Sequence, residues 1–260
     1  MILKRIKDFL LTLYLIPAKM NFRLAMSLRN RILPDYQHIA ALQLMINKMN
    51  RKLDMGNLIL DVGCFEGGTC TFLSKIKNVK VIGFEANPEA FKKAVETTKN
   101  NPSVKIENFA VSETNGFADI YITDNQVSSS LNPIAGGNLK FSTKKVERVK
   151  TISLDGYLAE YSLQNDKILA IKLDVQGHEL KVLRGAIKTL ARTFFVLTEM
   201  SNHTDYKGGT TYFEVDALLR EQGFTLQNTF APFTYEEALY EYDALYLNRE
   251  LFNRNSEDNN

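Results

Sequence analysis

The stretch LILDVGCFEGGT, residues 58–69, decides the fold. Its first five residues form an apolar run of strand length, and Gly63, Gly67 and Gly68 follow within a few residues. A short apolar run bounded by glycines is typical of a buried strand, and glycines let a backbone approach a ligand closely because they have no Cβ. A strand, a glycine turn and a helix in this order predict the first unit of an open parallel sheet, in which ligands bind beyond the carboxyl ends of the strands.

Outward from this stretch, apolar runs of strand length alternate with amphipathic stretches of helical spacing. We expect strands at 58–63, 79–85, 104–111, 118–123, 148–154, 168–174, 194–200, 225–228 and 244–247. We expect helices at 67–77, from Pro88 onward, at 179–190 and at 211–222. The alternation predicts an α/β, Rossmann-like fold, whose mostly parallel sheet carries helices on both faces. The last two strands resemble a hairpin, which predicts an antiparallel edge strand.

The chain divides into three parts by texture and charge. Residues 1–55 show helical patterning and carry ten Lys or Arg against three Asp, which gives +7 and leaves −5 for the rest of a chain whose net charge is +2. We expect the sheet domain at 56–250 and a disordered polar tail at 251–260. The basic segment predicts a surface or partner contact. No basic stripe with interleaved aromatics runs through the sheet domain, which argues against nucleic acid as a partner.

The N-terminal segment contains an apolar run at 9–16 that is too short to span a membrane. It lacks the small-residue cleavage site of a signal peptide. Apolar residues recur in it at helical spacing: Leu3, Ile6, Leu10, Leu13 and Ile16. We expect residues 1–20 to form an amphipathic helix that packs on the domain or makes a dimer contact, with peripheral contact to an anionic membrane surface as the alternative. Cys64 and Cys70 fit packing roles in a reduced compartment, which predicts a cytoplasmic protein or one peripheral at the inner membrane surface.

The spacing of the glycines indicates which ligand the turn binds. A dinucleotide site prefers Gly-x-Gly-x-x-Gly, whereas this turn reads Gly-x-x-x-Gly-Gly and has Phe65 where the second glycine would make room for a pyrophosphate. S-adenosylmethionine needs no phosphate cradle, and its positive groups suit the carboxylate of Asp61 at the strand end. Glu85 ends the next strand, 22 residues after Gly63, where an acid can accept hydrogen bonds from both ribose hydroxyls. We therefore predict S-adenosylmethionine as the cofactor; a helix cap or a solvated strand end is the plainer interpretation of either acid alone.

Residues 124–145 form the longest stretch without periodicity. Loops longer than about 12–15 residues are uncommon unless they are functional or disordered. We expect this stretch to be a lid on the substrate side of the site. Together with the polar loop at 201–209, it is where we expect the substrate to be selected.

Five motifs occur in order along the sheet domain: LILDVGCFEGGT, VIGFEANPEAF, ENFAVSETNG, TISLDGYL and IKLDVQGHELKVLRGA. Together they resemble the FkbM family of methyltransferases over residues 57–248. The resemblance implies a class I methyltransferase fold with a seven-stranded sheet and S-adenosylmethionine as the methyl donor. It also implies O-methylation of a hydroxyl on a sugar, a glycan or a natural-product scaffold.

Matched position by position, the resemblance also implies a set of cofactor-binding residues. They are Asp61, Gly63 and Gly67 in the methionine-side loop, Glu85 at the ribose, and Asn108 and Ala110 at the adenine. Apart from the resemblance, we also predict cofactor contacts for Phe65 in the glycine turn and for Asp174 at the end of a buried strand. Position 176 is Gln, where this family often has Glu. That difference removes a carboxylate and weakens a role for Gln176 as a base or a metal ligand.

Methyl transfer to oxygen requires a hydroxyl aligned with the sulfonium methyl and a base that takes its proton. We predict His178, Asp174 and Glu199 as the catalytic residues, because they close or follow two central strands. His178 titrates near neutrality and suits a base, although packing or capping at the start of the next helix is the favoured interpretation. Asp174, Glu199 and a histidine would also permit a divalent-metal site, which we do not favour. His203 fits solvation as well as function, and His38 is expected to be structural.

Two other functions stay open. A non-catalytic adaptor that keeps the fold is supported by Gln176 and opposed by the intact glycine turn and its acids. A nicotinamide-dependent oxidoreductase is opposed by the glycine spacing and by the lack of a Tyr-x-x-x-Lys pair in the sequence.

Overall fold

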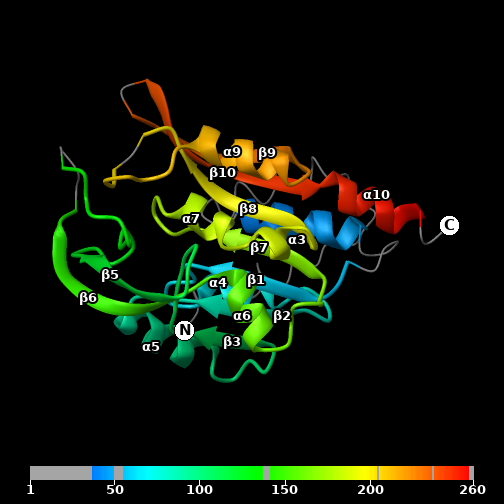
Figure 1. Cartoon of the computed structure of the whole chain (residues 1–260), viewed down its shortest axis with the longest axis horizontal. Coiled ribbons are helices and arrows are strands. Elements are labelled where there is room, and N and C mark those ends of the chain that lie inside the picture. Colours follow the sequence, from blue (N-terminus) through cyan, green and yellow to red (C-terminus); the bar gives the residue numbers. More distant parts are fainter. Residues whose placement is uncertain (1–36, 50–54, 137–140, 204, 236, 258–260) are drawn as a thin grey trace, which may run out of the picture.

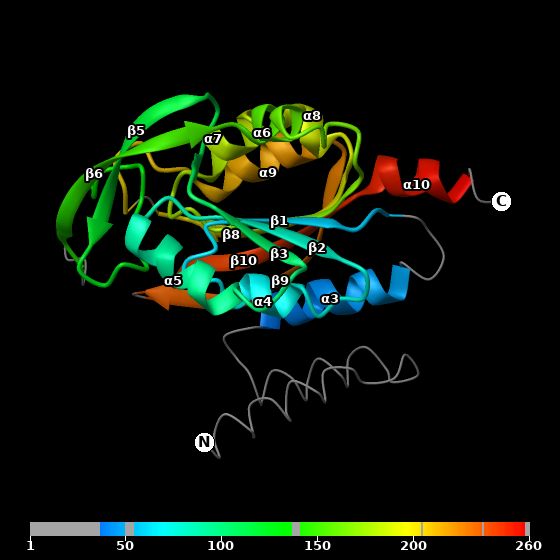
Figure 2. The ribbon, with the colours of Figure 1, turned by 90° about the horizontal axis from the view of Figure 1, so that it is seen from below.

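The computed structural model describes residues 37–49, 55–136, 141–203, 205–235 and 237–257 (Figure 1). Its main sheet has seven strands in the order β3-β2-β1-β7-β8-β10-β9. They are β1 (Leu58–Val62), β2 (Lys80–Phe84), β3 (Val104–Glu107), β7 (Ile168–Leu173), β8 (Thr193–Ser201), β9 (Phe224–Tyr235) and β10 (Ala238–Asn248). The helices are α3 (Gln37–Met49), α4 (Gly68–Leu73), α5 (Pro88–Thr98), α6 (Leu154–Glu160), α7 (Glu179–Arg184), α8 (Ile187–Leu190), α9 (Tyr212–Glu221) and α10 (Arg249–Glu257). Figure 2 shows α3, α4 and α5 on one face of the sheet and α6 to α9 on the other, which confirms the predicted α/β fold.

The central strands are buried because helices cover both of their faces. Every residue of β1 and β7 is buried, and β1 pairs in parallel with β2 on one side and with β7 on the other. One apolar core lies on the α3–α4 face of the sheet and the other on the α6–α9 face. From β1 the chain builds outward through β2 to β3 and then returns to β7, so the strand order reverses beside β1. The carboxyl ends of β1, β2 and β7 meet at this switch point, where ligands bind in such sheets.

The predicted hairpin forms one edge of the main sheet, with β9 at the edge paired antiparallel to β10, which lies one position in. β10 runs antiparallel to both of its neighbours, β8 and β9, and lies between them. The residues Ala244–Leu247 at the centre of β10 are at most 1% exposed. An apolar strand of this kind needs a partner on each side, since an edge position would leave its backbone groups unpaired. The more exposed β9 takes the edge.

A second, smaller sheet has the order β4-β6-β5. Its strands are β4 (Ala110–Val111), β5 (Gly116–Thr123) and β6 (Thr143–Ile152). The sequence analysis placed strands at these positions but did not separate them from the main sheet. Figure 1 shows β5 and β6 projecting beside the main sheet. Ile120 and Ile122 of β5 pack with Ala110 and Val149 in a small core of their own.

Two helical segments differ from the expectation. The helix predicted at 179–190 is broken into α7 and α8 at Gly185 and Ala186. Gly185 packs so closely there that an added Cβ would lie 2.2 Å from the carbonyl oxygen of Ser112. Helix α6 was not predicted at all. Ser153 caps it, since its Oγ accepts a hydrogen bond from the backbone N–H of Gly156 at 3.1 Å.

The predicted disordered tail at 251–260 is wrong for residues 251–257, which belong to α10. Asn248 caps this helix by accepting a hydrogen bond at Oδ1 from the N–H of Leu251 (2.9 Å), and Leu251 and Phe252 pack against the core on the α3 face. The remaining tail residues and residues 1–36, with the predicted amphipathic helix, lie outside the described residues. Within the described part of the chain, no helix is long and apolar enough to cross a membrane.

Candidate active site

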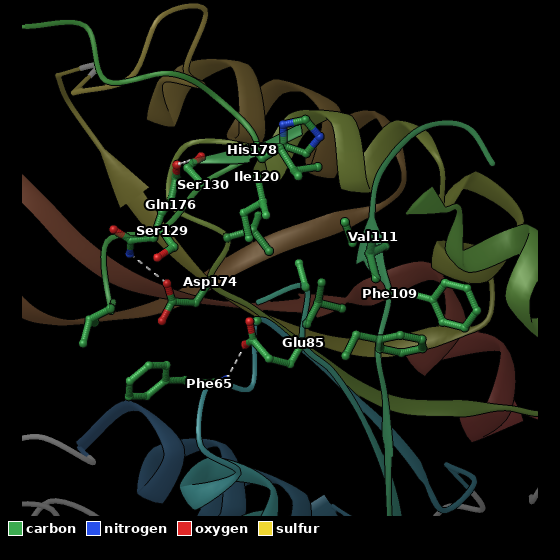
Figure 3. Close-up of a pocket in the computed structure, with 18 of the residues that line it drawn as sticks. Phe65, Glu85, Phe109, Val111, Ile120, Ser129, Ser130, Asp174, Gln176 and His178 are labelled. Atoms are coloured by element: carbon green, nitrogen blue, oxygen red, sulfur yellow. Dashed lines mark hydrogen bonds between the residues drawn. The ribbon is translucent and has the colours of Figure 1, made fainter. Parts of the chain in front are cut away.

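A pocket opens at the switch point of the sheet (Figure 3). It contains about 670 Å³ of empty space, part of which is open to solvent. Six of the predicted residues line it: Gly63, Phe65, Glu85, Ala110, Asp174 and His178. The other four do not: Asp61, Gly67, Asn108 and Glu199. The fold therefore brings most of the predicted site together and leaves the rest beneath or beside the pocket.

The glycine turn brings the backbone close to the pocket. Gly63 has a φ of +79°, and a Cβ added to it would lie 1.8 Å from the carbonyl oxygen of Asp174. Only glycine fits this position, because a side chain would both strain the backbone and displace the end of β7. Gly67 has a φ of +80° and packs against Ala94 of α5. Gly67 thus sets the approach of α4 and α5 and does not face the ligand space.

Glu85 closes β2 with its carboxylate held by two backbone N–H groups. Oε2 accepts from Phe65 and Oε1 accepts from Asn87, each at 2.8 Å. Asn108 lies beside it and donates from Nδ2 to the Glu85 carbonyl oxygen at 2.8 Å. Each carboxylate oxygen can accept a second hydrogen bond, so the group retains the capacity to accept both hydroxyls of a ribose. Burial raises the pKa of Glu85 to about 7.

Asp61 differs from the prediction in where its side chain lies. It is fully buried beneath the glycine turn, where its Oδ2 accepts from the Cys70 thiol at 3.1 Å. Its Oδ1 has no hydrogen-bond partner among the described residues and lies 3.6 Å from Lys172 Nζ. Burial raises the pKa of Asp61. Direct contact of Asp61 with a cofactor stays a prediction, and its position favours a role in supporting the turn.

Lys172 is a site residue that sequence analysis missed. It lies in β7 with its side chain 8% exposed, and its Nζ donates to the Gly63 carbonyl oxygen (3.2 Å) and to Asp174 Oδ2 (3.3 Å). With Asp61 also nearby, one cation lies between two acids under the glycine turn. The available signal was a lysine inside the otherwise apolar run ILAIKL.

Asp174, Gln176 and Glu199 form a hydrogen-bonded cluster at the ends of β7 and β8. The Gln176 Nε2 donates to Asp174 Oδ1 at 3.0 Å and to Glu199 Oε2 at 3.1 Å. Burial alone would raise the pKa of Asp174, but the neighbouring Lys172 and Gln176 hold it below its ordinary value. Burial, reinforced by the Asp174 charge, raises the pKa of Glu199 well above its ordinary range. At neutral pH Asp174 is therefore ionised and faces the pocket, while Glu199 lies behind it with a raised pKa.

His178 lines the pocket, but both of its ring nitrogens are engaged. Nε2 lies 2.9 Å from Ser112 Oγ, and Nδ1 lies 3.2 Å from Asn132 Oδ1. Asn132 donates from Nδ2 to the Gly177 carbonyl oxygen (2.8 Å), so its Oδ1 faces the histidine as an acceptor. This arrangement places the His178 hydrogen on Nδ1. Burial lowers the pKa of His178 to about 4, so the ring is neutral at physiological pH.

The loop predicted as a lid forms one wall of the pocket. Residues 124–136 of it are joined to the loop at 201–209 by a β-bridge between Ile134 and Tyr206, whereas its last residues, 143–145, belong to β6 and correct the predicted extent of the loop. The Tyr206 hydroxyl lies 2.8 Å from the Ser128 carbonyl oxygen and 3.2 Å from Gln176 Oε1. The two loops that sequence analysis assigned to substrate selection are therefore in contact. Residues 137–140 of this stretch lie outside the described residues.

The remaining histidines lie outside the pocket lining. His203 is exposed and stacks on Tyr240 with ring centroids 5.2 Å apart, and His38 Nδ1 lies 3.0 Å from Asp243 Oδ2. Among the described residues, no group of three or more His, Cys, Asp or Glu side chains is arranged to hold a metal ion. The groups that would meet in the suggested metal site, Asp174 and Glu199, are instead linked by the Gln176 amide.

The sheet order, the inserted antiparallel strand and the pocket between a glycine turn and a strand-end acid define a class of protein. It is that of the class I methyltransferases, which use S-adenosylmethionine. A family model for the methyltransferase FkbM domain matches residues 61–226. The chain belongs to this family, as its motifs predicted, and is an S-adenosylmethionine-dependent methyltransferase.

Two curated relatives are similar to the chain over more than half of its length. The hexuronic acid methyltransferase AglP of Haloferax volcanii is 28% identical over 179 residues, which cover 65% of this chain and 70% of the relative. The 2-O-methyltransferase NoeI of Sinorhizobium fredii is 27% identical over 162 residues, which cover 58% of this chain and 66% of the relative. Among solved structures, the magnesium protoporphyrin IX methyltransferase of Synechocystis is 11% identical with a TM-score of 0.45, and the match covers 92% of this chain and 90% of that protein.

Proposed function

We propose that the protein transfers the methyl group of S-adenosylmethionine to a hydroxyl oxygen of a saccharide. The observation that carries this proposal is that Glu85 and Asp174 line a single pocket at the switch point. Glu85 can accept hydrogen bonds from the ribose of the cofactor, and Asp174 can accept one from the hydroxyl that is methylated. The names of the two curated relatives, a hexuronic acid methyltransferase and a 2-O-methyltransferase, support a saccharide hydroxyl as the acceptor.

The residues of the pocket fit the cofactor in chemistry and in shape. Glu85 would accept the ribose hydroxyls, and the close backbone at Gly63 would receive the methionine end. Phe109 and Val111 line the pocket with Ala110 and provide an apolar wall of the kind that an adenine ring requires. When bound, S-adenosylmethionine supplies an electrophilic methyl group on a sulfonium.

On the acceptor side, we assign Asp174 as the group that orients the reacting hydroxyl and receives its hydrogen. Its carboxylate faces the pocket, as Figure 3 shows, and it is ionised at neutral pH. Glu199 acts through Gln176 and is a positioning residue in this proposal. His178 is assigned the same kind of role, because its two nitrogens hold Ser112 and Asn132 and leave no free lone pair for a hydroxyl.

Calorimetric binding of S-adenosylmethionine and, separately, of NAD tests the cofactor half of the proposal. We expect binding of S-adenosylmethionine alone. Glu85→Ala should weaken that binding by at least about tenfold, because hydrogen bonds to a charged group contribute about 1.5–3 kcal/mol. Replacement of the exposed Glu113 by Ala is the matched control and should leave the affinity unchanged.

Methyl transfer to a panel of saccharides, followed by mass spectrometry, tests the acceptor half. A folded protein that binds S-adenosylmethionine but methylates no saccharide hydroxyl would contradict the acceptor assignment. Absence of S-adenosylmethionine binding by a demonstrably folded protein would contradict the whole proposal.

A further inference from the structure

The serine and glutamine donors on the acceptor side of the pocket are already engaged. Ser129 Oγ donates to the carbonyl oxygen of Gln126, and Ser130 Oγ donates to the carbonyl oxygen of Gln176, each at 2.7 Å. A hydroxyl has one hydrogen, so neither serine has a second one to donate. The side-chain amide of Gln126 donates to Glu89 at 3.2 Å. An incoming molecule therefore meets few side-chain donors on this wall.

Gln176 and Asp174 complete the same wall. The two hydrogens of Gln176 Nε2 point to Asp174 and Glu199, which uses its donor capacity. Asp174 accepts one hydrogen bond at each oxygen, from Gln176 and from Lys172, and its side chain remains 39% exposed. Each of its oxygens can accept another hydrogen bond. At Asp174 the free hydrogen-bonding capacity of this wall is therefore acceptor capacity on a carboxylate. Gln126, whose amide has two hydrogens, donates one of them to Glu89 and keeps the other.

The charge of the residues that line the pocket also disfavours a carboxylate on the acceptor. Glu85 and Asp174 are the charged side chains among the described lining residues, and both are acids. A carboxylate on an incoming saccharide would face like charge, and its oxygens would find acceptors in place of donors. A hydroxyl meets neither penalty, because it can donate its hydrogen to Asp174.

We propose that the acceptor is a saccharide that presents hydroxyl groups, and no carboxylate, to the wall formed by Ser129, Ser130 and Asp174. This inference rests on the proposed function and narrows its substrate class to neutral sugars. It also separates the chain from the relative AglP, whose name specifies a hexuronic acid and with which it shares 28% identity.

The experiment uses matched pairs of acceptors that differ only in the carboxylate. The full chain and S-adenosylmethionine are incubated with methyl glucoside or methyl glucuronide, and with methyl galactoside or methyl galacturonide. S-adenosylhomocysteine release and product mass give kcat/KM for each acceptor. We expect the neutral member of each pair to be preferred by at least about tenfold, since one unpaired, repelled charge has an effect of this order.

A charge introduced at the rim tests the physical reason. Val127 lines the pocket and is 59% exposed, so Val127→Arg adds a cation there without removing a side-chain hydrogen bond. We expect Val127→Arg to reduce the preference for neutral acceptors at least about threefold, through a gain with the uronates. Val95→Arg, at a 43% exposed position of α5 outside the lining, is the matched control and should leave the preference unchanged.

The outcomes separate the two proposals. Equal or faster methylation of the uronates would overturn this inference and leave the saccharide methyltransferase function standing. Methylation of neither member of either pair, by a protein that binds S-adenosylmethionine, would count against the saccharide acceptor itself and so against both.

Discussion

Lys172 carries a charge inside the sheet, and its neighbours explain how the fold tolerates it. The Nζ lies between Asp61 and Asp174, while the Gly63 carbonyl oxygen accepts one of its hydrogens. Removal of one partner from a buried ion pair typically costs about 3–5 kcal/mol, because the remaining charge has no compensation. The residue that stabilises the glycine turn is thus the same residue that keeps Asp174 ionised.

Lys172→Met should therefore affect both stability and the pH profile. We expect the free energy of unfolding to fall by about 3–5 kcal/mol, and the double variant Asp61→Asn/Lys172→Met to recover roughly half of that loss, because it also removes one unpaired acid. Urea denaturation measures both.

Asp174 has a depressed pKa in the native protein, so its ionised form is lost only at low pH. Without Lys172 that pKa rises, and the acidic limb of kcat/KM should move to higher pH. Lys150→Met, at an exposed position of β6, should change neither quantity.

Glu85 predicts a pH dependence of cofactor binding. Its pKa is about 7 because burial outweighs the hydrogen bonds from Asn87 and Phe65 and the nearby charge of Lys172. Ribose hydroxyls need the ionised carboxylate as an acceptor, so affinity should be constant above pH 7 and should fall by up to about tenfold per pH unit below it. Calorimetry between pH 5.5 and 8.5 measures this. In Glu85→Gln the slope should disappear, and a slope that persists there would assign the titration to another group.

Tyr206 joins two loops at the scale of the element. It is 6% exposed, its hydroxyl contacts Ser128 and Gln176, and its backbone bridges to Ile134. Tyr206→Phe keeps the ring and removes the hydroxyl. We expect KM for the acceptor to rise roughly 2–10-fold, in line with a hydrogen bond of about 0.5–1.5 kcal/mol, while the dissociation constant of S-adenosylmethionine stays unchanged. The control is Tyr161→Phe, at a 41% exposed position beside α6.

The elements of the fold differ in how far the sequence predicts them. The strands at 58–62 and 168–173 were predicted because each is an apolar run interrupted by a single charged residue, and burial on two faces produces such runs. The place of β10 was not predicted, because pairing order depends on contacts between distant segments and not on local pattern. The same holds for α10, whose polar composition concealed the cap at Asn248 and the two apolar residues that anchor it.

The site shows the same division. The glycine turn and Glu85 were predicted because a local spacing rule describes them. The burial of Asp61 and the role of Lys172 were not predicted. Packing of His178 at the helix start was the favoured interpretation, but its partners Ser112 and Asn132 were not predicted. Each of these depends on which side chain meets another across the fold, as Ser112 and His178 do at a separation of 66 residues.

At the scale of the whole molecule, one sheet carries both apolar cores, so a ligand at the switch point stabilises both. S-adenosylhomocysteine at 100 times its dissociation constant should add about 2.7 kcal/mol to the free energy of unfolding. For a chain of this size that corresponds to a rise in Tm of roughly 5–10 °C. Differential scanning calorimetry checks the shift, which Glu85→Ala should reduce. A Tm independent of ligand concentration would contradict a site at the shared centre of the two cores.

The position of β10 has a consequence for the order of events during synthesis. Translation completes β9 before β10, yet within the described part of the chain β9 pairs only with β10. While residues 238–248 are still inside the ribosome, β8 is the edge strand of the partly formed sheet, and β9 has no strand to pair with. The sheet closes on this side only when β10 emerges and inserts between them, so strand pairing in the main sheet is completed after this segment has passed through the exit tunnel. Until then, the unpaired edge of β8 and strand β9 are open to chaperones that recognise extended apolar segments.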